Sequence, residues 1–196
     1  VAQEKMKGQE VVEEKALAKI KDKWIFNSYQ SQSEENTATQ RAEGMVKTYV
    51  KWEKETKNEL VGLEVPFDVK IGDITFTGRI DRLEKNPDGK YEVVDFKSGK
   101  TVKSKNKAKI DPQLNIYAKA VEKLKGELPV KASLFYVEKD KMVVYPVTEE
   151  SVNETMDTII GMTKEIMLEN FDATPSYNAC MFCSYQSICD AKVTEE

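Results

Sequence analysis

The change of hydrophobic period along the chain constrains its fold more than any other sequence feature. From Ala38 to Trp52, apolar residues recur at intervals of four and three, which is the spacing of one helix face. From Leu63 to Ile71 they alternate with polar residues, which is the period of a strand with one buried face. Helices and strands of these kinds bury their apolar faces against each other, so we expect an α/β or α+β fold.

Turn signals divide the strand region into successive strands. Gly72 and Asp73 have the composition of a tight hairpin turn, and Ile74–Lys85 is expected to return from it as a second strand. The sequence NPDG at 86–89 predicts the next turn, and KYEVVDFKSG after it predicts a third strand. The stretch Val130–Val147 has the pattern of another hairpin.

Helices are expected before, between and after these strands. Residues 4–24 carry apolar side chains along one side of a helix. A second helix is predicted to have Asp111 as its cap and Pro112 at its first position, and to end at Gly126. Residues 149–169 are predicted to form a final long helix. This order of elements indicates a mixed central β-sheet flanked by helices.

The length of the chain sets the expected domain organisation. A chain of 196 residues is long enough to bury one sizeable core. We therefore expect a single domain over 1–196. Its parts are expected to be N-terminal helices over 1–60, a sheet with the 111–125 helix over 61–148, and a C-terminal helix with an irregular tail over 149–196.

The composition argues against a membrane protein. Hydrophobic residues make up 40% of the chain and charged residues 33%, which is ordinary for a globular protein. No apolar run approaches the ~20 residues that span a bilayer, and no signal-peptide pattern opens the chain. We expect an intracellular, cytoplasmic protein without a membrane partner. Because the sequence begins at Val1 rather than at methionine, we also expect a fragment of a longer protein.

Two charged residues interrupt the third predicted strand. Asp95 and Lys97 are two positions apart, so their side chains leave the strand on the same face. If the second and third strands pair through the NPDG turn, Asp81 lies beside Asp95. Two adjacent carboxylates repel each other unless a hard divalent cation lies between them. With a lysine that orients a water or offsets charge on a phosphate, they make a hydrolytic site for phosphodiesters.

The alternative interpretation is a salt-bridged pair on an exposed sheet face, since the pattern D-x-K is common by chance. The helix that follows favours the hydrolytic site. Gln113 and Tyr117 are four residues apart and share one face of that helix. They lie in its first turns, where backbone N–H groups favour an anion.

A lysine-rich run lies between the third strand and this helix. The net charge of the chain is −4, but residues 97–109 hold six lysines and no acid. Blocks of like charge are commonly solvated loops. Beside a hydrolytic site, however, such a block is placed to neutralise the phosphates of a bound DNA strand. The candidate DNA-backbone contacts are Lys100, Lys103, Lys105, Lys107 and Lys109.

Three motifs in succession, GRIDR at 78–82, VVDFKSGK at 93–100 and QLNIY at 113–117, resemble those of RecB-like nucleases of the PD-(D/E)XK superfamily. Each motif alone is weak, but the ordered set is specific. The resemblance implies a restriction-endonuclease-like core and a metal-dependent exonuclease that acts on single-stranded DNA or duplex ends. It also implies a partner helicase domain or subunit, and a role in DNA repair and recombination.

The resemblance implies a role for each matched residue. Asp81 and Asp95 would bind Mg²⁺ or Mn²⁺, together with the backbone carbonyl of Phe96. Lys97 would position the attacking water, while the glutamine and tyrosine of the QLNIY motif would arrange the substrate and Lys97. The residues implied to be catalytic are Asp81, Asp95, Lys97, Gln113 and Tyr117.

One further ligand of this family has no counterpart here. Many of these nucleases bind the metal with a histidine on the first helix, whereas the matching stretch GQEVVEE has Val12 at that position, and the chain contains no histidine. Glu10, Glu13 or water would then complete the shell, since Mg²⁺ commonly keeps several waters. Glu64 matches a glutamate often seen before the GRIDR-type strand, and a surface-facing strand glutamate is an equal alternative.

All three cysteines, Cys180, Cys183 and Cys189, lie in C-x2-C-x5-C spacing near the C-terminus. An odd number in one short segment favours metal or cluster ligands over a disulfide framework. The spacing resembles part of the iron–sulfur site of AddB-type subunits and CRISPR-adaptation exonucleases, in which a fourth cysteine lies upstream. That resemblance implies a [4Fe-4S] cluster in the full-length protein. Zn²⁺ with a fourth ligand, a disulfide and plain thiols are the alternatives.

Two functional hypotheses follow from these residues. The first is a Mg²⁺- or Mn²⁺-dependent deoxyribonuclease that cleaves the DNA backbone without recognising bases. The second is a catalytically weakened DNA-binding or iron–sulfur scaffold of the same fold, because the histidine is absent. The ordered acids and Lys97 favour the nuclease, since a scaffold has no need to keep them in register.

Overall fold

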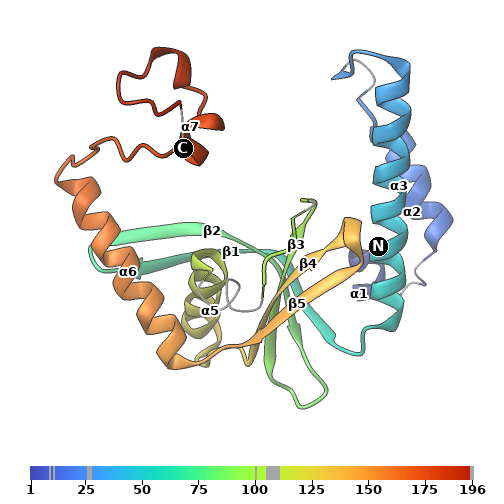
Figure 1. The fold of residues 1–196 in the computed structure, drawn as a ribbon. Helices are drawn as coiled ribbons and strands as arrows, with labels where there is room; N and C mark the ends of the chain where they lie inside the picture. Colours follow the sequence, from blue (N-terminus) through green and yellow to red (C-terminus); the bar gives the residue numbers. More distant parts are fainter. Residues whose placement is uncertain (9, 11, 26–27, 100, 105–110, 195–196) are drawn as a thin grey trace. The chain divides into compact units, whose positions relative to one another are not determined.

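The computed structural model contains two compact units, Val1–Ile159 and Ile160–Glu196 (Figure 1). Compactness alone does not divide a chain into independently folding domains, so the single-domain organisation stays a prediction. The structure describes residues 1–8, 10, 12–25, 28–99, 101–104 and 111–194.

The first unit is built on a mixed five-stranded sheet, as the sequence predicts (Figure 1). The strands lie in the order β1-β2-β3-β4-β5, with β3 and β4 parallel and the other neighbours antiparallel. A parallel pair needs a crossover connection, which here contains a helix. The strands are β1 (Glu59–Ile71), β2 (Ile74–Lys85), β3 (Tyr91–Lys97), β4 (Lys131–Tyr136) and β5 (Lys141–Pro146).

Both predicted turns are present in the β1–β2–β3 meander. Gly72 in the first turn has a φ of 60°, and Gly89 in the second has a φ of 77°, values that glycine adopts without steric cost. The second turn sets a register in which Arg82 faces Val94. It therefore decides which residues of β2 lie beside the charged end of β3.

The single helix predicted over 4–24 is wrong, because two helices, α1 (Ala2–Met6) and α2 (Glu13–Lys23), replace it. Gly8 has a φ of 70° and its N–H donates to the Lys5 carbonyl, so α1 ends there in the left-handed conformation typical of a helix C-terminus. The apolar period continues across the break and did not reveal it.

α3 (Gln32–Glu55) packs on one face of β3. The predicted apolar stripe of this helix is half-buried. Within it, the ring of Trp52 lies 5.8 Å from the ring of Phe96 and 5.2 Å from that of Phe135. Because successive residues of a strand point to opposite faces, this contact places Lys97 on the other face.

α5 (Pro112–Lys125) is the crossover helix, and it lies on the face of β3 opposite to α3 (Figure 1). Its termini are as predicted. The Asp111 side chain accepts hydrogen bonds from two backbone N–H groups of the first turn, and Gly126 after the last turn has a φ of 80°. Buried Asn115 donates to Thr155 Oγ1 at 2.9 Å, which joins α5 to the helix that follows the sheet.

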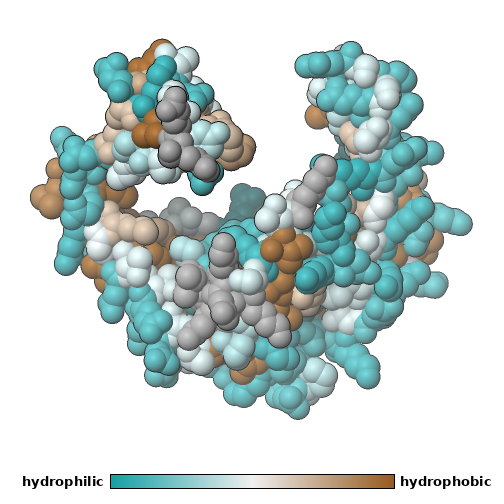
Figure 2. All heavy atoms as spheres, in the orientation of Figure 1, coloured by the Kyte–Doolittle hydropathy of each residue, from teal (hydrophilic) through white to brown (hydrophobic). Residues whose placement is uncertain are grey.

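The remaining short elements are η2 (Val137–Lys139) between β4 and β5, and α7 (Tyr177–Met181) and η3 (Gln186–Ile188) in the tail. α6 (Glu149–Met167) runs from the first unit into the second. Figure 2 shows apolar atoms on the surface of the second unit, where Phe182 is 82% exposed. Within the described ranges, no helix is both long and apolar enough to cross a membrane.

Candidate active site

The candidate site lies where strands β2 and β3 part. Their backbone pairing ends at Arg82 and Val94, whereas β3 stays paired with β4 as far as Lys97. One step beyond the end of the pairing, the register places Asp81 opposite Asp95. The ladder is replaced there by a side-chain bond, since Asp81 Oδ2 accepts from the Phe96 N–H at 3.0 Å. The fork leaves room for polar side chains between two strands of a buried sheet.

Asp95 is the most deeply buried acid of this group, with 1% of its surface exposed. Burial raises its pKa, the Lys97 ammonium opposes that rise, and the negative charges of Asp81 and Asp111 reinforce it. Lys97 Nζ lies 2.7 Å from Asp95 Oδ2. The contact is an ion pair outside hydrogen-bond geometry, so Asp95 Oδ2 is left without a hydrogen-bond partner among the described residues.

α5 delivers two polar side chains to the same place. Lys97 Nζ donates to Gln113 Oε1 at 2.7 Å, and Gln113 Nε2 donates to the Tyr117 hydroxyl at 2.9 Å. Burial raises the pKa of Tyr117 to about 12. The hydrogen bond from Gln113 lowers this pKa, and the negative charges of Asp81 and Asp95 raise it further. The tyrosine therefore stays protonated at neutral pH, and its O–H remains a donor.

The structure thus brings together five of the residues that the sequence singled out. The Asp95 carboxylate, an ammonium group, an amide and a phenol form one chain of contacts at the fork, and the Asp81 carboxylate accepts a bond from the backbone next to Asp95. The five residues therefore lie near one another at the fork, while the site and the catalytic roles of these residues stay predictions. The residues are Asp81, Asp95, Lys97, Gln113 and Tyr117.

Glu64 lies on β1 in an unusual backbone conformation. Its φ is 48°, in the left-handed region that a residue with a side chain adopts at a cost of about 1–2 kcal/mol. The register of β1 and β2 places it opposite Asp81, and its charge contributes to the raised pKa of Tyr117. Glu64 is exposed, so it is both a surface glutamate and a neighbour of the site.

Asp111 is a site neighbour that the sequence identified only as a helix cap. One of its carboxylate oxygens caps α5, and the other forms an ion pair with Lys103 Nζ at 2.5 Å. Its charge also contributes to the raised pKa of Asp95. The D-P pair before a helix signals a cap, but no local signal shows that the charge of this cap also acts on Asp95.

Of the predicted DNA-backbone lysines, Lys103 is the one that the structure describes. It is exposed, its ammonium pairs with Asp111, and its backbone N–H donates to the Tyr136 hydroxyl at 3.1 Å. Its role in DNA binding stays a prediction. Lys100, Lys105, Lys107 and Lys109 lie outside the described residues.

The donors at the fork fit a hard divalent cation. Two carboxylates and a backbone carbonyl are oxygen ligands, and Mg²⁺ is commonly bound by one or two carboxylates together with waters. Oδ2 of buried Asp95, which has the Lys97 ion pair but no hydrogen bond among the described residues, is an atom that a cation would satisfy. In the part of the chain that the structure describes, no group of three or more acidic, histidine or cysteine side chains is arranged to hold a metal ion. Water ligands would therefore make up much of the shell.

The first helices do not supply a replacement for the missing histidine among the described contacts. Val12 is the residue before α2, and Glu13 begins that helix. α2 packs on α3 through Ala16 and Val50. No described contact links Glu10 or Glu13 to the carboxylates at the fork, so compensation by either glutamate stays a prediction.

The three cysteines line one small pocket in the second unit. Cys180 is buried, Cys189 is half-buried and Cys183 is exposed, and all three are free thiols. The Val193 N–H donates to Cys180 Sγ at 3.4 Å, so the tail turns back on the first cysteine. The disulfide alternative is not realised in this structure, while the cluster and zinc alternatives stay predictions.

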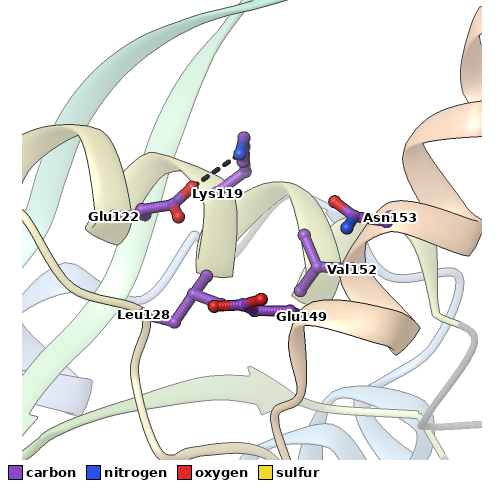
Figure 3. A pocket seen from close by; sticks show the side chains of 6 residues that line it. All are labelled: Lys119, Glu122, Leu128, Glu149, Val152 and Asn153. Carbon is purple, nitrogen blue, oxygen red and sulfur yellow. Dashed lines mark ion pairs between the residues drawn. The ribbon is translucent and has the colours of Figure 1, made fainter.

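A different pocket lies beside α5 and the start of α6 (Figure 3). It is lined mainly by polar side chains, and Lys119 and Glu122, neighbours on α5, form an ion pair at 2.6 Å on one side of it. None of the five residues at the fork lines it. It is therefore separate from the candidate site.

The chain is similar to known proteins in sequence and in structure. The sequence model of the PD-(D/E)XK nuclease superfamily matches residues 2–190. The CRISPR-associated exonuclease Cas4 of Saccharolobus solfataricus is 31% identical over 121 residues, which cover 60% of this chain and 53% of that protein. The chain thus spans about half the length of this curated relative. The crystal structure of SSO0001 superposes with a TM-score of 0.43 at 22% identity, covering 82% of this chain and 80% of that one.

Proposed function

Since this chain belongs to the PD-(D/E)XK nuclease superfamily, we propose that it is a divalent-metal-dependent deoxyribonuclease that hydrolyses DNA from an end. Membership of the family supports nuclease chemistry and the expected restriction-endonuclease-like core. The choice of DNA, the exonuclease mode and the metal are the proposed part. The Cas4 relative, which is named as an exonuclease, supports the mode.

The convergence of Asp81, Asp95 and Lys97 at the fork is the observation that carries this proposal. Asp95 is a buried carboxylate with a raised pKa and with one oxygen that has no hydrogen bond among the described residues, which costs stability. Sites of this kind are concentrated where chemistry takes place. A mere surface ion pair does not account for it, because Asp95 is 1% exposed. The residues at the fork also come from the successive family-like motifs GRIDR and VVDFKSGK, which supports the same proposal.

Lys97 is held so that one of its donors stays available. An ammonium group has three N–H donors. One side of Nζ faces Asp95 Oδ2 and another N–H is bonded to Gln113 Oε1. The remaining donor can orient a water toward the phosphorus atom or bind a phosphate oxygen. Tyr117, protonated and bonded to the same glutamine, fixes that glutamine and adds an O–H donor.

Asp81, Asp95 and the backbone carbonyl of Phe96 would hold the divalent cation, Mg²⁺ or Mn²⁺. When bound, such an ion supplies Lewis-acid charge to the oxygens of the scissile phosphate. Asp81 is already oriented by the bond from the Phe96 N–H. This bond keeps the Asp81 carboxylate on the Asp95 side of the fork before a substrate arrives.

For the cysteine tail, we propose a [4Fe-4S] cluster whose fourth thiolate comes from a cysteine beyond residues 1–196. Four thiolates are the usual ligands of such a cluster. The common pocket of Cys180, Cys183 and Cys189, and the N–H···S bond to Cys180, support a shared site. Zinc with a fourth ligand is the alternative, and the absorbance and metal content of protein purified without oxygen distinguish them.

The biological context is proposed from resemblance alone. The RecB-like motifs suggest a helicase partner and a role in DNA repair and recombination. The CRISPR-associated relative suggests another setting for the same chemistry. The second candidate function, a DNA-binding scaffold without cleavage, is motivated by the absence of histidine from the sequence.

Cleavage assays distinguish nuclease from scaffold. Single-stranded and duplex DNA are incubated with Mg²⁺ or Mn²⁺ and the parent protein, Asp95→Ala or Lys97→Ala. We expect each substitution to lower the rate on the order of 10²–10³-fold, the usual effect of removing a group that stabilises developing charge. Matched controls are Asp88→Ala and Lys57→Ala, which alter exposed residues away from the fork and should cleave like the parent.

Two results would contradict the nuclease proposal. If cleavage survives both site substitutions, the activity is a contaminant or comes from elsewhere in the chain. If the folded parent cleaves no DNA with either metal, the scaffold function replaces the nuclease.

A further inference from the structure

A second pocket adjoins the candidate active site. It shares Gln113 and Tyr117 with that site and continues along the β1–β2 hairpin. Its volume of about 330 Å³ is near the lower end of small-ligand clefts, roughly 300–1,000 Å³. The pocket is therefore large enough for one flat ring system and too small for a folded segment of another protein. Its other lining residues include Phe67, Phe76, Gly78 and Arg79.

The two phenylalanines of this pocket have different surroundings. Phe67 is buried, and its ring packs edge-on against Tyr117 with centroids 5.8 Å apart. Phe76 is half-buried, and it packs on no other aromatic ring over the described ranges. Phe67 therefore forms a packed side of the pocket, whereas Phe76 keeps part of its surface available to a ligand.

Gly78 explains how the pocket stays open. A Cβ at this position would lie 2.8 Å from Cζ of Phe67, closer than real contacts allow. The Phe67 ring therefore rests directly on the backbone of β2. A larger residue would push the ring away from the strand, toward Tyr117 or the pocket.

Arg79 gives the pocket its charge. It is exposed, and no acidic partner is found for it among the described residues. Asp81 lies two positions further along β2, so a group bound near Arg79 is also near the fork. Arg79 and Phe76 are three positions apart on β2, so their side chains leave the strand on opposite faces, and the guanidinium does not lie against the Phe76 ring. A guanidinium without an acidic partner is suited to a phosphate of the strand that continues from a base held in the pocket.

We propose that this pocket binds one unpaired nucleotide next to the scissile phosphate, with its base against Phe76 and a phosphate of the adjoining strand on Arg79. The inference deepens the proposed nuclease function and rests on it. Stacking on an aromatic side chain accepts any base, because every base has a π-face. The site would thus favour single-stranded over duplex ends without reading sequence.

Binding is measured first without any cleavage. The full chain, in buffer with EDTA, is titrated into fluorescein-labelled single-stranded 12-mers, each carrying one abasic residue at a different position. We expect one position near an end at which loss of the base weakens binding on the order of 5- to 100-fold. The other positions should change affinity much less.

Substitutions then assign that position to Phe76. Phe76→Leu should weaken binding of the intact 12-mer by the same factor and should no longer respond to the abasic residue. Phe76→Trp keeps an aromatic face and should restore both the affinity and the response. Phe171→Ala, which removes an exposed phenylalanine of the other unit, is the matched control and should bind like the parent.

Arg79 is tested through salt dependence. A lost phosphate contact should lower the slope of log affinity against log salt by about 0.7 for a single strand. Arg79→Ala should show this change, whereas Lys70→Ala, exposed on the same hairpin, should not. Circular dichroism of each variant verifies that it is folded.

The outcomes separate this inference from the nuclease proposal. If no oligonucleotide binds, if all abasic positions are tolerated alike, or if Phe76→Leu binds like the parent, the pocket has no nucleotide role. Cleavage by the parent together with any of these results overturns the pocket alone. An abasic-sensitive parent that cleaves no DNA with Mg²⁺ or Mn²⁺ keeps the pocket and overturns the nuclease. If Phe76→Leu does not fold, the abasic series decides by itself.

Discussion

Asp81 and Arg82 are neighbours in sequence but belong to two opposite kinds of charged cluster. Arg82 is fully buried and binds Glu53 through two nitrogens, at 2.6 and 3.1 Å, and Glu84 at 2.5 Å. All four oxygens of those two glutamates have partners, since Lys5, Tyr49 and Asn58 complete them. In the cluster that contains Asp81, by contrast, one buried oxygen of Asp95 has no hydrogen bond from any residue that the structure describes.

The difference teaches how to separate a structural charge cluster from a functional one. In the Arg82 cluster, burial lowers the pKa of the guanidinium, but the bonds and charges of Glu53 and Glu84 outweigh it, so the net shift is upward. The ring of Trp52 covers it at 4.8 Å. Satisfied groups hold α3 to the sheet. The Asp95 cluster keeps repulsion between like charges, which a bound cation would relieve.

The largest effect is expected from breaking the satisfied cluster. Arg82→Ala leaves Glu53 and Glu84 buried without their cation, so the free energy of unfolding should fall by about 3–5 kcal/mol in urea titrations. Arg79→Ala, exposed on the same strand, should change it by less than ~0.5 kcal/mol. Replacing Arg82, Glu53 and Glu84 together by leucine should recover most of the loss. If Arg82→Ala is as stable as the parent, the cluster does not hold α3.

A substitution in the Asp95 cluster is expected to change the free energy of unfolding in the opposite direction. Without metal, Asp95→Asn should raise the free energy of unfolding by about 1–2 kcal/mol at neutral pH, because it removes a buried charge that repels its neighbours. Lys97 remains 30% exposed, so its ammonium keeps water when the partner is lost. Urea unfolding in EDTA measures the gain, and loss of cleavage in the same variant is the expected cost.

The pH dependence of stability follows from the raised pKa of Asp95. The native carboxyl keeps its proton to a higher pH than the unfolded chain, whose ordinary value is 3.8. The parent's stability from this group is complete below that value and falls as pH rises through the higher native pKa. The difference in stability between Asp95→Asn and the parent should therefore grow over this interval. A constant difference would contradict the raised pKa.

The smallest effect is expected at Glu64. Glycine adopts the φ of 48° found there without the steric cost of a side chain, so Glu64→Gly should raise the thermal midpoint by the equivalent of about 1 kcal/mol. Cleavage by the same variant shows whether the strained carboxylate takes part in the site. Unchanged cleavage would make Glu64 a surface residue, and a higher KM or a lower kcat would place it with Asp81.

Much of the fold was predictable because its signals are local. The period of two over Leu63–Ile71, the NPDG turn and the Asp111 cap each act within a few residues, and each is present in the structure. The break at Gly8 was missed because the apolar period continues through it. A glycine in a helical pattern is tolerated often enough that it does not mark an end by itself.

The candidate site was likewise predictable where its signals are local and unpredictable where its contacts join distant parts of the chain. Alternation along β3 and the register of one turn were sufficient to place Asp81, Asp95 and Lys97 together. The pairing of Arg82 with Glu53, 29 residues away, had no local signal.

The sequence by itself therefore determined the strands, the helices apart from the break at Gly8, and the shared face of Asp95 and Lys97. Side-chain direction along a strand depends on backbone geometry alone. The tertiary structure decided which charges are satisfied. It parts β2 from β3 at the fork, brings Gln113 to Lys97 across the crossover, and buries Asp95 while Lys97 keeps contact with solvent. Those outcomes depend on how helices pack against a twisted sheet, and no short stretch of sequence encodes them.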